Sequence, residues 1–142
     1  MPITQVSIAV ENSPGSLNEV GEIMEYEHIN IKAIMASSVL TPVQLHLIVD
    51  DPQRAKNVLE SKGFSVSTKE VIAVGIPDHP GALNAVLRPL REASVNIDTL
   101  YPFINTSGED AIVILEVDKI KEAKDILRKN WIRTYSTEIY KS

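Results

Sequence analysis

The chain has no cysteine. This absence excludes a disulfide scaffold, a thiol nucleophile and any site in which cysteine holds zinc or an iron–sulfur cluster. Positive charge is also in short supply, with 14 Lys and Arg against 19 Asp and Glu, so the formal net charge is −5. Proteins that bind nucleic acid normally carry a basic footprint. We therefore expect no nucleic-acid partner.

Long apolar runs are missing. No run approaches the roughly 20 residues that a helix needs to cross a bilayer, and the opening residues MPITQ lack the basic n-region of a secretory signal. We therefore expect a cytoplasmic protein that has no membrane association. The 142 residues are 44% hydrophobic and 23% charged, which is typical of one ordinary globular domain or two very small ones.

Catalytic and cofactor motifs are absent too. His28, His46 and His79 are far apart in the sequence and none belongs to an H-E-x-x-H pattern, so a zinc site has no support. The sequence contains no G-x-G-x-x-G, no P-loop and no G-x-S-x-G elbow. We therefore expect a protein that is not an enzyme and that uses no metal or cofactor; a small enzyme is the weakest of the functions considered.

An internal repeat is present instead. The segment PGSLNEV at 14–20 recurs as PGALNAV at 80–86, with five of seven positions identical and an offset of 66 residues. The same offset places Asn30 and Ile31 on Asn96 and Ile97. Farther along we predict an offset of 67, which pairs Asp51 with Asp118, Leu59 with Ile126, Gly63 with Asn130 and Phe64 with Trp131. One inserted residue around Asn105–Gly108 would explain the change.

The order of elements is also repeated. Each copy has the pattern strand, helix, strand, strand, helix, strand, judged from apolar periodicity and turn signals. This order predicts an α+β fold made of two ferredoxin-like βαββαβ domains with antiparallel sheets. We place the first domain at residues 1–68 and the second at 69–142, with strands at 64–68 and 71–76 on either side of the boundary.

A basic and aromatic cluster lies near the C-terminus, at Arg128, Lys129, Trp131 and Arg133. The end of a helix accounts for the basic pair, since cations are favourable there. We expect Trp131 to lie in a buried strand at 131–135.

The loop before the first helix of each copy is the one segment that suggests a binding site. Gly15 would let a ligand approach the backbone, and the N–H groups of Gly15, Ser16 and Leu17 would have no partner within the helix. Such a helix start suits a small carboxylate, while Asn12 or Asp78 could accept from an ammonium group. The alternative is that Pro-Gly merely makes a tight turn into the helix, with Ser13 as N-cap.

The repeated pattern resembles a known family. The motif (D/N)-x-P-G-x-L-x-x-V, followed after about ten residues by (I/V)-N-I, is similar to that of the ACT domain and occurs at 12–31 and 78–97. The resemblance covers essentially the whole chain and is closest to proteins made only of two tandem ACT domains. It implies the βαββαβ fold and the binding of small molecules, usually amino acids, at interfaces between domains.

The resemblance also implies ligand-binding residues. In the first copy they are Asn12, Ser13, Gly15, Ser16, Leu17 and Asn30; in the second they are Asp78, His79, Gly81, Ala82, Leu83 and Asn96, with Tyr101 as a candidate pocket wall. The two copies differ, because Asp78 and His79 replace Asn12 and Ser13. A carboxylate at position 78 repels a ligand carboxylate and attracts an ammonium group. We expect either two sites of unequal affinity or one that no longer works.

The function that these observations favour is that of a non-catalytic regulatory protein, in which an amino acid shifts the population of domain arrangements. The alternative is a regulatory subunit that docks on a separate enzyme of amino-acid biosynthesis. We also expect a homodimer, because two strands are apolar on both faces whereas helices can cover only one face of a sheet. In one strand Ile34 and Ala36 lie opposite Ala33 and Met35, and in the other Val113 and Leu115 lie opposite Ile112 and Ile114.

Overall fold

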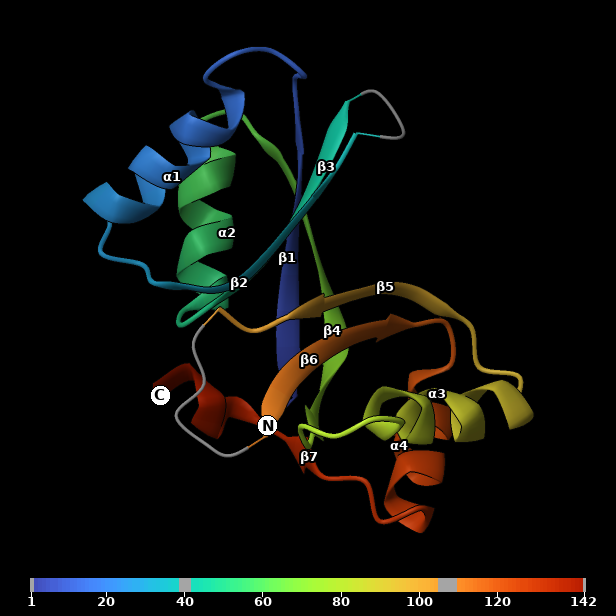
Figure 1. Ribbon diagram of the computed structural model, residues 1–142. Helices are drawn as coiled ribbons and strands as arrows, with labels where there is room; N and C mark the ends of the chain where they lie inside the picture. Colours follow the sequence, from blue (N-terminus) through green and yellow to red (C-terminus); the bar gives the residue numbers. More distant parts are fainter. Residues whose placement is uncertain (1, 39–41, 105–109, 142) are drawn as a thin grey trace. The chain divides into compact units, whose positions relative to one another are not determined.

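Strands and helices follow one another in the same order twice along the chain. The structure is a computed structural model that describes residues 2–38, 42–104 and 110–141. It divides into a first unit, Thr4–Lys69, and a second unit, Glu70–Ser142 together with Met1–Ile3. Each unit has the βαββαβ order (Figure 1). The prediction of an α+β fold with two ferredoxin-like repeats is confirmed.

The first unit places its two helices on one face of its sheet. Its elements are β1 (Ile3–Val10), α1 (Ser16–Tyr26), β2 (Ile31–Ser37), β3 (Val43–Val49), α2 (Pro52–Ser61) and the first part of β4 (Ser65–Ile76). The strand order is β2-β3-β1-β4. Alternate residues of β1 and β3 point to the helices and form one core with Val20, Met24, Ala55 and Leu59, as period-two burial requires.

The second unit repeats this plan. Its elements are the second part of β4, α3 (Ala82–Glu92), β5 (Ile97–Pro102), β6 (Ala111–Val117), α4 (Ile120–Lys129) and β7 (Thr134–Tyr135), followed by the 3-10 turn η1 (Thr137–Lys141). The strand order is β7-β4-β6-β5. Its core joins alternate residues of β4 and β6 to Val86, Leu90, Ala123 and Leu127 of the helices.

One strand belongs to both repeats. We predicted separate strands at 64–68 and 71–76, but β4 runs without a break from Ser65 to Ile76, over 12 residues. The segment at 67–70 is Ser-Thr-Lys-Glu, and none of these residues is the Gly, Pro or Asn that punctuates a strand. The prediction of two strands is therefore wrong, and the last strand of one repeat is also the first strand of the next.

The spacing of the second half of the repeat also differs from the prediction. The backbone N–H of Asn30 donates to Oδ1 of Asp50 at 3.1 Å, and that of Asn96 donates to Oδ1 of Asp118 at 2.9 Å. Asp118 is therefore the counterpart of Asp50, not of Asp51. Strand pairing gives the same offset of 68, with Ile31 opposite Val49 and Ile97 opposite Val117.

Two extra residues, not one, thus separate β5 from β6. They fall between Pro102 and Val113, which pair in the second unit as Ala36 and Leu45 do in the first. The loop at 105–108, where we placed the insertion, lies outside the described residues.

The four α-helices of the described ranges end in the same way. A residue with positive φ follows each helix: His28, Gly63, Ser94 and Trp131, at 56°, 92°, 57° and 60°. The next N–H then donates to the carbonyl five residues back, at 2.9–3.1 Å, in the pairs Ile29–Met24, Phe64–Leu59, Val95–Leu90 and Ile132–Leu127. This is the Schellman arrangement, and each bond joins two apolar residues that pack together.

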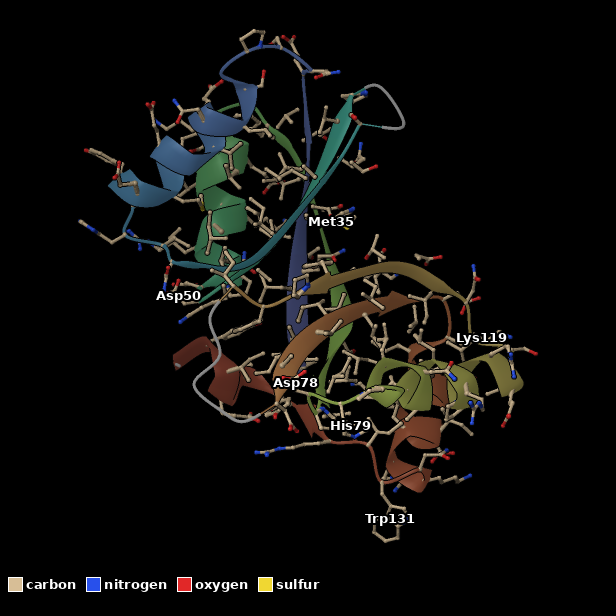
Figure 2. The ribbon with its side chains drawn as sticks, viewed as in Figure 1. Met35, Asp50, Asp78, His79, Lys119 and Trp131 are labelled. Carbon is tan, nitrogen blue, oxygen red and sulfur yellow. The ribbon has the colours of Figure 1, made fainter. Side chains whose placement is uncertain are left out.

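Trp131 therefore occupies the place of Gly63, and Ile132 occupies that of Phe64. Trp131 is 95% exposed, and its side chain projects from the end of α4 into solvent (Figure 2). The prediction of a buried Trp131 in a strand at 131–135 is wrong, because it depended on the offset of 67. The last strand is confined to Thr134 and Tyr135.

This placement predicts an unusual stability effect. A non-glycine residue in the left-handed region costs about 1–2 kcal/mol, part of which glycine offsets by its freedom in the unfolded chain. Because the exposed ring of Trp131 buries almost nothing, we expect Trp131→Gly to raise the free energy of unfolding by up to about 1 kcal/mol. Urea unfolding followed by far-UV circular dichroism measures this value.

The matched control is the neighbouring Ile132→Ala. Ile132 packs on the core, and we expect its truncation to cost about 2 kcal/mol or more. A loss of that size for Trp131→Gly would contradict the assignment of Trp131 to the exposed position.

Candidate functional site

The Pro-Gly loops are type II β-turns. In the first unit the turn spans Ser13–Ser16, with Pro14 second and Gly15 third at φ 86° and ψ −9°, and the N–H of Ser16 donates to the carbonyl of Ser13 at 3.2 Å. A type II turn favours proline at the second position and requires positive φ at the third, which selects glycine. Backbone geometry therefore requires glycine at position 15 whether or not a ligand binds there.

The second unit has the same turn. Gly81 has φ 85° and ψ −4°, and the N–H of Ala82 donates to the carbonyl of His79 at 3.2 Å. The loop that carries Asp78 and His79 leads directly into α3 (Figure 2). Nδ1 of His79 lies 3.0 Å from the carbonyl oxygen of Pro80, so this ring folds back on its own turn.

The turn changes two details of the sequence prediction. Ser13 is not an N-cap, since Gly15 holds that position without a side-chain cap, and Oγ of Ser13 lies 2.7 Å from Oγ of Ser16. The N–H of Ser16 has no partner within the helix, as expected, but it is not available to a ligand because it donates to the Ser13 carbonyl. Both details have one cause: the chain closes a turn at Ser16, where the helix begins.

Two free donors remain at the start of each of these helices. The first bonds within the helices run from Glu19 to the Gly15 carbonyl at 2.9 Å and from Ala85 to the Gly81 carbonyl at 3.0 Å. Among the described residues, the N–H groups of Leu17, Asn18, Leu83 and Asn84 have no hydrogen-bond partner. A helix start with free N–H groups carries partial positive charge and stabilises an anion.

A hollow of about 710 Å³ lies at the second loop. The loop and the start of α3 form one side, and Asp110 and Ala111 at the start of β6 form the other. Asp78 and Asp110 are its acidic lining residues. One carboxylate oxygen of Asp110 lies close to Gly75 and to the Tyr135 hydroxyl, so Asp78 is the acidic side chain that the loop itself brings to the hollow. Ala82 lines it too, but the Ala82 side chain is 5% exposed and packs in the core; its contribution is to hold α3 in place.

Asn30 and Asn96 do not lie with the loops. Each follows the end of its helix, whereas the loop precedes the start, and 11 helical residues span about 16 Å. The backbone of each Asn is tied to Asp50 or Asp118, while the residue itself is exposed. Within one unit, therefore, a small ligand at the loop does not reach the Asn, and the predicted residues fall into two groups.

A second hollow, of about 460 Å³, lies at the Asn96 end of α3. Leu87 lines both hollows, and Arg91 lines this one. With Leu83 these residues form an i, i+4, i+8 stripe along α3. Leu87 and Arg91 are not among the residues predicted from the sequence, although helical spacing from Leu83 indicates both of them. Nothing in the sequence indicates that Asp110 lies beside the loop.

Tyr101 lies on β5, on the face of the sheet that points away from α3 and α4. Its strand partner is Ile114, and the neighbours of Ile114 in the sequence, Val113 and Leu115, belong to the core under the helices. Tyr101 is 2% exposed. Burial, with the Glu116 carboxylate, raises the pKa of its hydroxyl well above the usual value. Tyr101 lines neither of the two hollows.

Two further features of the described residues bear on function. In the part of the chain that the structure describes, no three His, Asp or Glu side chains are grouped so that they could hold a metal ion. In the same residues, every helix is too short or too polar to cross a membrane.

Comparison with solved structures supports the fold. A protein from Bacteroides thetaiotaomicron is 30% identical, with a TM-score of 0.90, over 100% of this chain and 98% of that one. The ligand-free regulatory subunit of aspartate kinase from Thermus thermophilus is 19% identical, with a TM-score of 0.64, over 91% of this chain and 90% of that one. The alpha and beta subunits of an aspartokinase are 17% identical, with a TM-score of 0.62, over 90% and 91%.

Comparison with protein families is more specific. Curated proteins gave no match, but the family model described as "ACT domain pair" matches residues 1–138. This match covers both βαββαβ repeats, both Pro-Gly turns and both asparagines. The chain belongs to the ACT domain pair family.

Proposed function

We propose that the chain is a non-catalytic regulatory protein of the cytoplasm that binds a free amino acid at its ACT domain interfaces. The observation that carries the proposal is the hollow at the second loop, which is lined by residues with free N–H groups and by the acidic residue Asp78. The two charged groups of an amino acid need these two kinds of partner. Membership of the ACT domain pair family supports the same conclusion.

The recognition we propose uses two kinds of partner in the hollow. The N–H groups of Leu83 and Asn84 bind the ligand carboxylate, since hydrogen bonds to a charged acceptor are the stronger kind. Asp78 accepts from the ammonium group. The first loop has Asn12 and Ser13 where the second has Asp78 and His79, so it offers a neutral acceptor. We therefore propose that the two loops bind with unequal affinity.

Regulation follows from the distance between the two groups of site residues. Because the loop and the Asn lie at opposite ends of a helix, a ligand that contacts both kinds of residue must bridge two domains. Such a ligand stabilises the arrangement in which the domains meet and shifts the population toward it. We propose that copies of the chain form a homodimer in this process.

Ile112 and Ile114 do not form an exposed apolar face that a second copy would have to cover. Ile112 and Ile114, on the sheet face away from the helices, are 8% and 0% exposed in a single chain. They therefore give no separate reason for a second copy. The proposed homodimer depends instead on the bridging of domains and on the surfaces described in the next subsection.

The alternative function is that of a regulatory subunit for a separate enzyme of amino-acid biosynthesis. The two functions differ in what the protein binds. Under the first, affinity purification from the native cell yields the chain with copies of itself. Under the second, a larger catalytic protein copurifies in a fixed ratio.

The first test of the proposed function is a thermal-shift screen against the proteinogenic amino acids. A ligand that binds only the folded state at 100 times its Kd adds about 2.7 kcal/mol, which for a chain of this size raises Tm by roughly 5–10 °C. We expect one amino acid, or a small group of similar ones, to produce such a shift.

The matched control is the methyl ester of the same amino acid, which keeps the ammonium and the side chain but loses the carboxylate charge. We expect the ester to produce little or no shift. If no amino acid raises Tm at millimolar concentration, or if the ester works equally well, the proposed ligand class is wrong.

A second test removes one N–H donor. Gly81 is unsuitable for substitution because its φ of 85° strains any side chain with a Cβ. Asn84 is exposed and lies in the first turn of α3, where proline is accepted most readily. We expect Asn84→Pro to weaken binding by about 10- to 150-fold, equivalent to one hydrogen bond to a charged group at about 1.5–3 kcal/mol.

Asn84→Ala is the control, because it removes the same side chain and keeps the N–H group. Calorimetric titration with the amino acid found in the screen compares the two variants, and circular dichroism verifies that both are folded. Equal affinities for Asn84→Pro and Asn84→Ala would show that this N–H group does not bind the ligand.

A further inference from the structure

The net charge of −5 is unevenly distributed, and two segments of the chain carry opposite charge. The first 31 residues contain five glutamates and no Lys or Arg. Residues 119–133 contain six Lys and Arg against two acidic residues. The acidic segment includes α1 in the first unit, and the basic segment includes α4 in the second.

The acidic segment presents a ridge on α1. Glu19, Glu22 and Tyr26 are exposed at positions i, i+3 and i+7, so they follow one line along the helix, while Val20 and Met24 are buried against the sheet. Tyr26 is 81% exposed, although a tyrosine ring is largely apolar. Glu22 accepts a hydrogen bond from Asn18. Glu19, Glu22 and Tyr26 are called the acidic ridge below.

The basic segment forms one wall of a groove of about 960 Å³ in the second unit. Lys121, Lys124 and Arg128 line the groove from α4, again at i, i+3 and i+7, and Trp131 stands at its edge. The floor is apolar and comes from Ile3, Val71, Ile72 and Ile132. This groove is called the α4 groove below.

The charges of the α4 groove are only partly neutralised from within. Lys124 pairs with Glu70, and Arg128 and Lys129 share Asp125. Asp125 and Glu138 are the acidic residues that line the groove. Lys121 has no partner among the described residues, and the residues that line the groove include three cations against two carboxylates. The groove therefore keeps an excess of positive charge over an apolar floor, which suits an acidic helix that also carries an aromatic side chain.

We infer that the acidic ridge of one copy docks in the α4 groove of a second copy. Both lines have the same spacing, about 4.5 Å and 10.5 Å along a helix, so parallel helices place Glu19 near Lys121, Glu22 near Lys124 and Tyr26 near Arg128. The last pair allows a cation–π contact. Every copy carries both surfaces, so a two-fold axis would bury two such pairs at once.

This inference depends on the proposed self-association but not on the proposed ligand. A different acidic protein is the competing occupant of the groove. The two are distinguished by whether the purified chain associates with itself and whether that association responds to charge on α1.

The experiment reverses each surface in the full-length chain. Lys121→Glu with Arg128→Glu reverses the groove, Glu19→Lys with Glu22→Lys reverses the ridge, and a fourfold variant reverses both. Sedimentation velocity at 50 mM salt measures the dimerisation Kd. We expect each double variant to dimerise at least about tenfold more weakly, because like charges then face each other. We expect the fourfold variant, and a mixture of the two double variants, to recover the native Kd.

The control for total charge is Lys62→Glu with Arg88→Glu. Both residues are exposed, on α2's C-terminal cap and on α3, and the change takes the net charge from −5 to −9 as the groove variant does. We expect this control to dimerise like the native chain. Circular dichroism verifies folding of every variant.

Trp131, the one tryptophan of the chain, supplies a second measurement on the native protein. Its emission should shift to shorter wavelength as the concentration rises through the Kd, and this shift should be absent in the ridge variant. A shift without dimerisation would overturn the inference.

Three other results would also overturn it. If the native chain is monomeric at all concentrations, both the surfaces and the proposed homodimer are wrong. If it dimerises but neither reversal weakens the dimer, the homodimer stands and these surfaces are wrong. If the control weakens the dimer as much as the groove reversal does, or if the mixture fails to recover the native Kd, the loss of affinity does not come from pairing of these two surfaces and the inference is wrong.

Discussion

Each α-helix in the described part of the chain ends with a hydrogen bond that spans five residues and joins the backbones of two apolar residues. This bond does two things at once. It stops the helix at a left-handed residue, and it turns the next apolar side chain back onto the core. Because the following strand starts within a few residues, the same bond determines which strand residues point to the helices. The position of Trp131, which exposes the largest side chain of the protein, follows from it directly.

The sequence predicted those parts of the fold that depend on identical residues. The Pro-Gly and Asn-Ile pairs gave the first offset correctly, because turn geometry and strand starts require those residue types. The second offset depended on apolar similarity alone, and a shift of one residue pairs Phe64 with Trp131 as plausibly as the true alignment pairs it with Ile132. Propensity does not place tryptophan in the left-handed position. The hydrogen bonds of Asp50 and Asp118, which resolve the offset, appear only in three dimensions.

The sequence predicted which residues belong to the candidate site, but not how these residues lie relative to one another. The family motif predicted that the loops and the asparagines share a ligand site. The strand–helix–strand order, however, places them at opposite ends of a helix in each unit. The residues that join the two ends on α3, Leu87 and Arg91, follow from helical periodicity once the helix is known. Asp110 is different: it comes beside the loop only because β6 pairs with β4. The corresponding stripe on α1 has Gly21 and Glu25, so the two copies have diverged in charge and shape as well as in their loops.

The unbroken β4 has a consequence for how this protein can change in length. Side chains of a strand alternate between faces, so one residue added or removed within Ser65–Ile76 would exchange the faces of every strand residue on one side of the change. The connection between β5 and β6 has taken up two extra residues relative to its counterpart, because a loop between strands has no such alternation to preserve. Natural length variation among relatives is therefore expected to collect in the hairpin loops and to avoid the junction of the repeats, whose length is as constrained as that of a core strand.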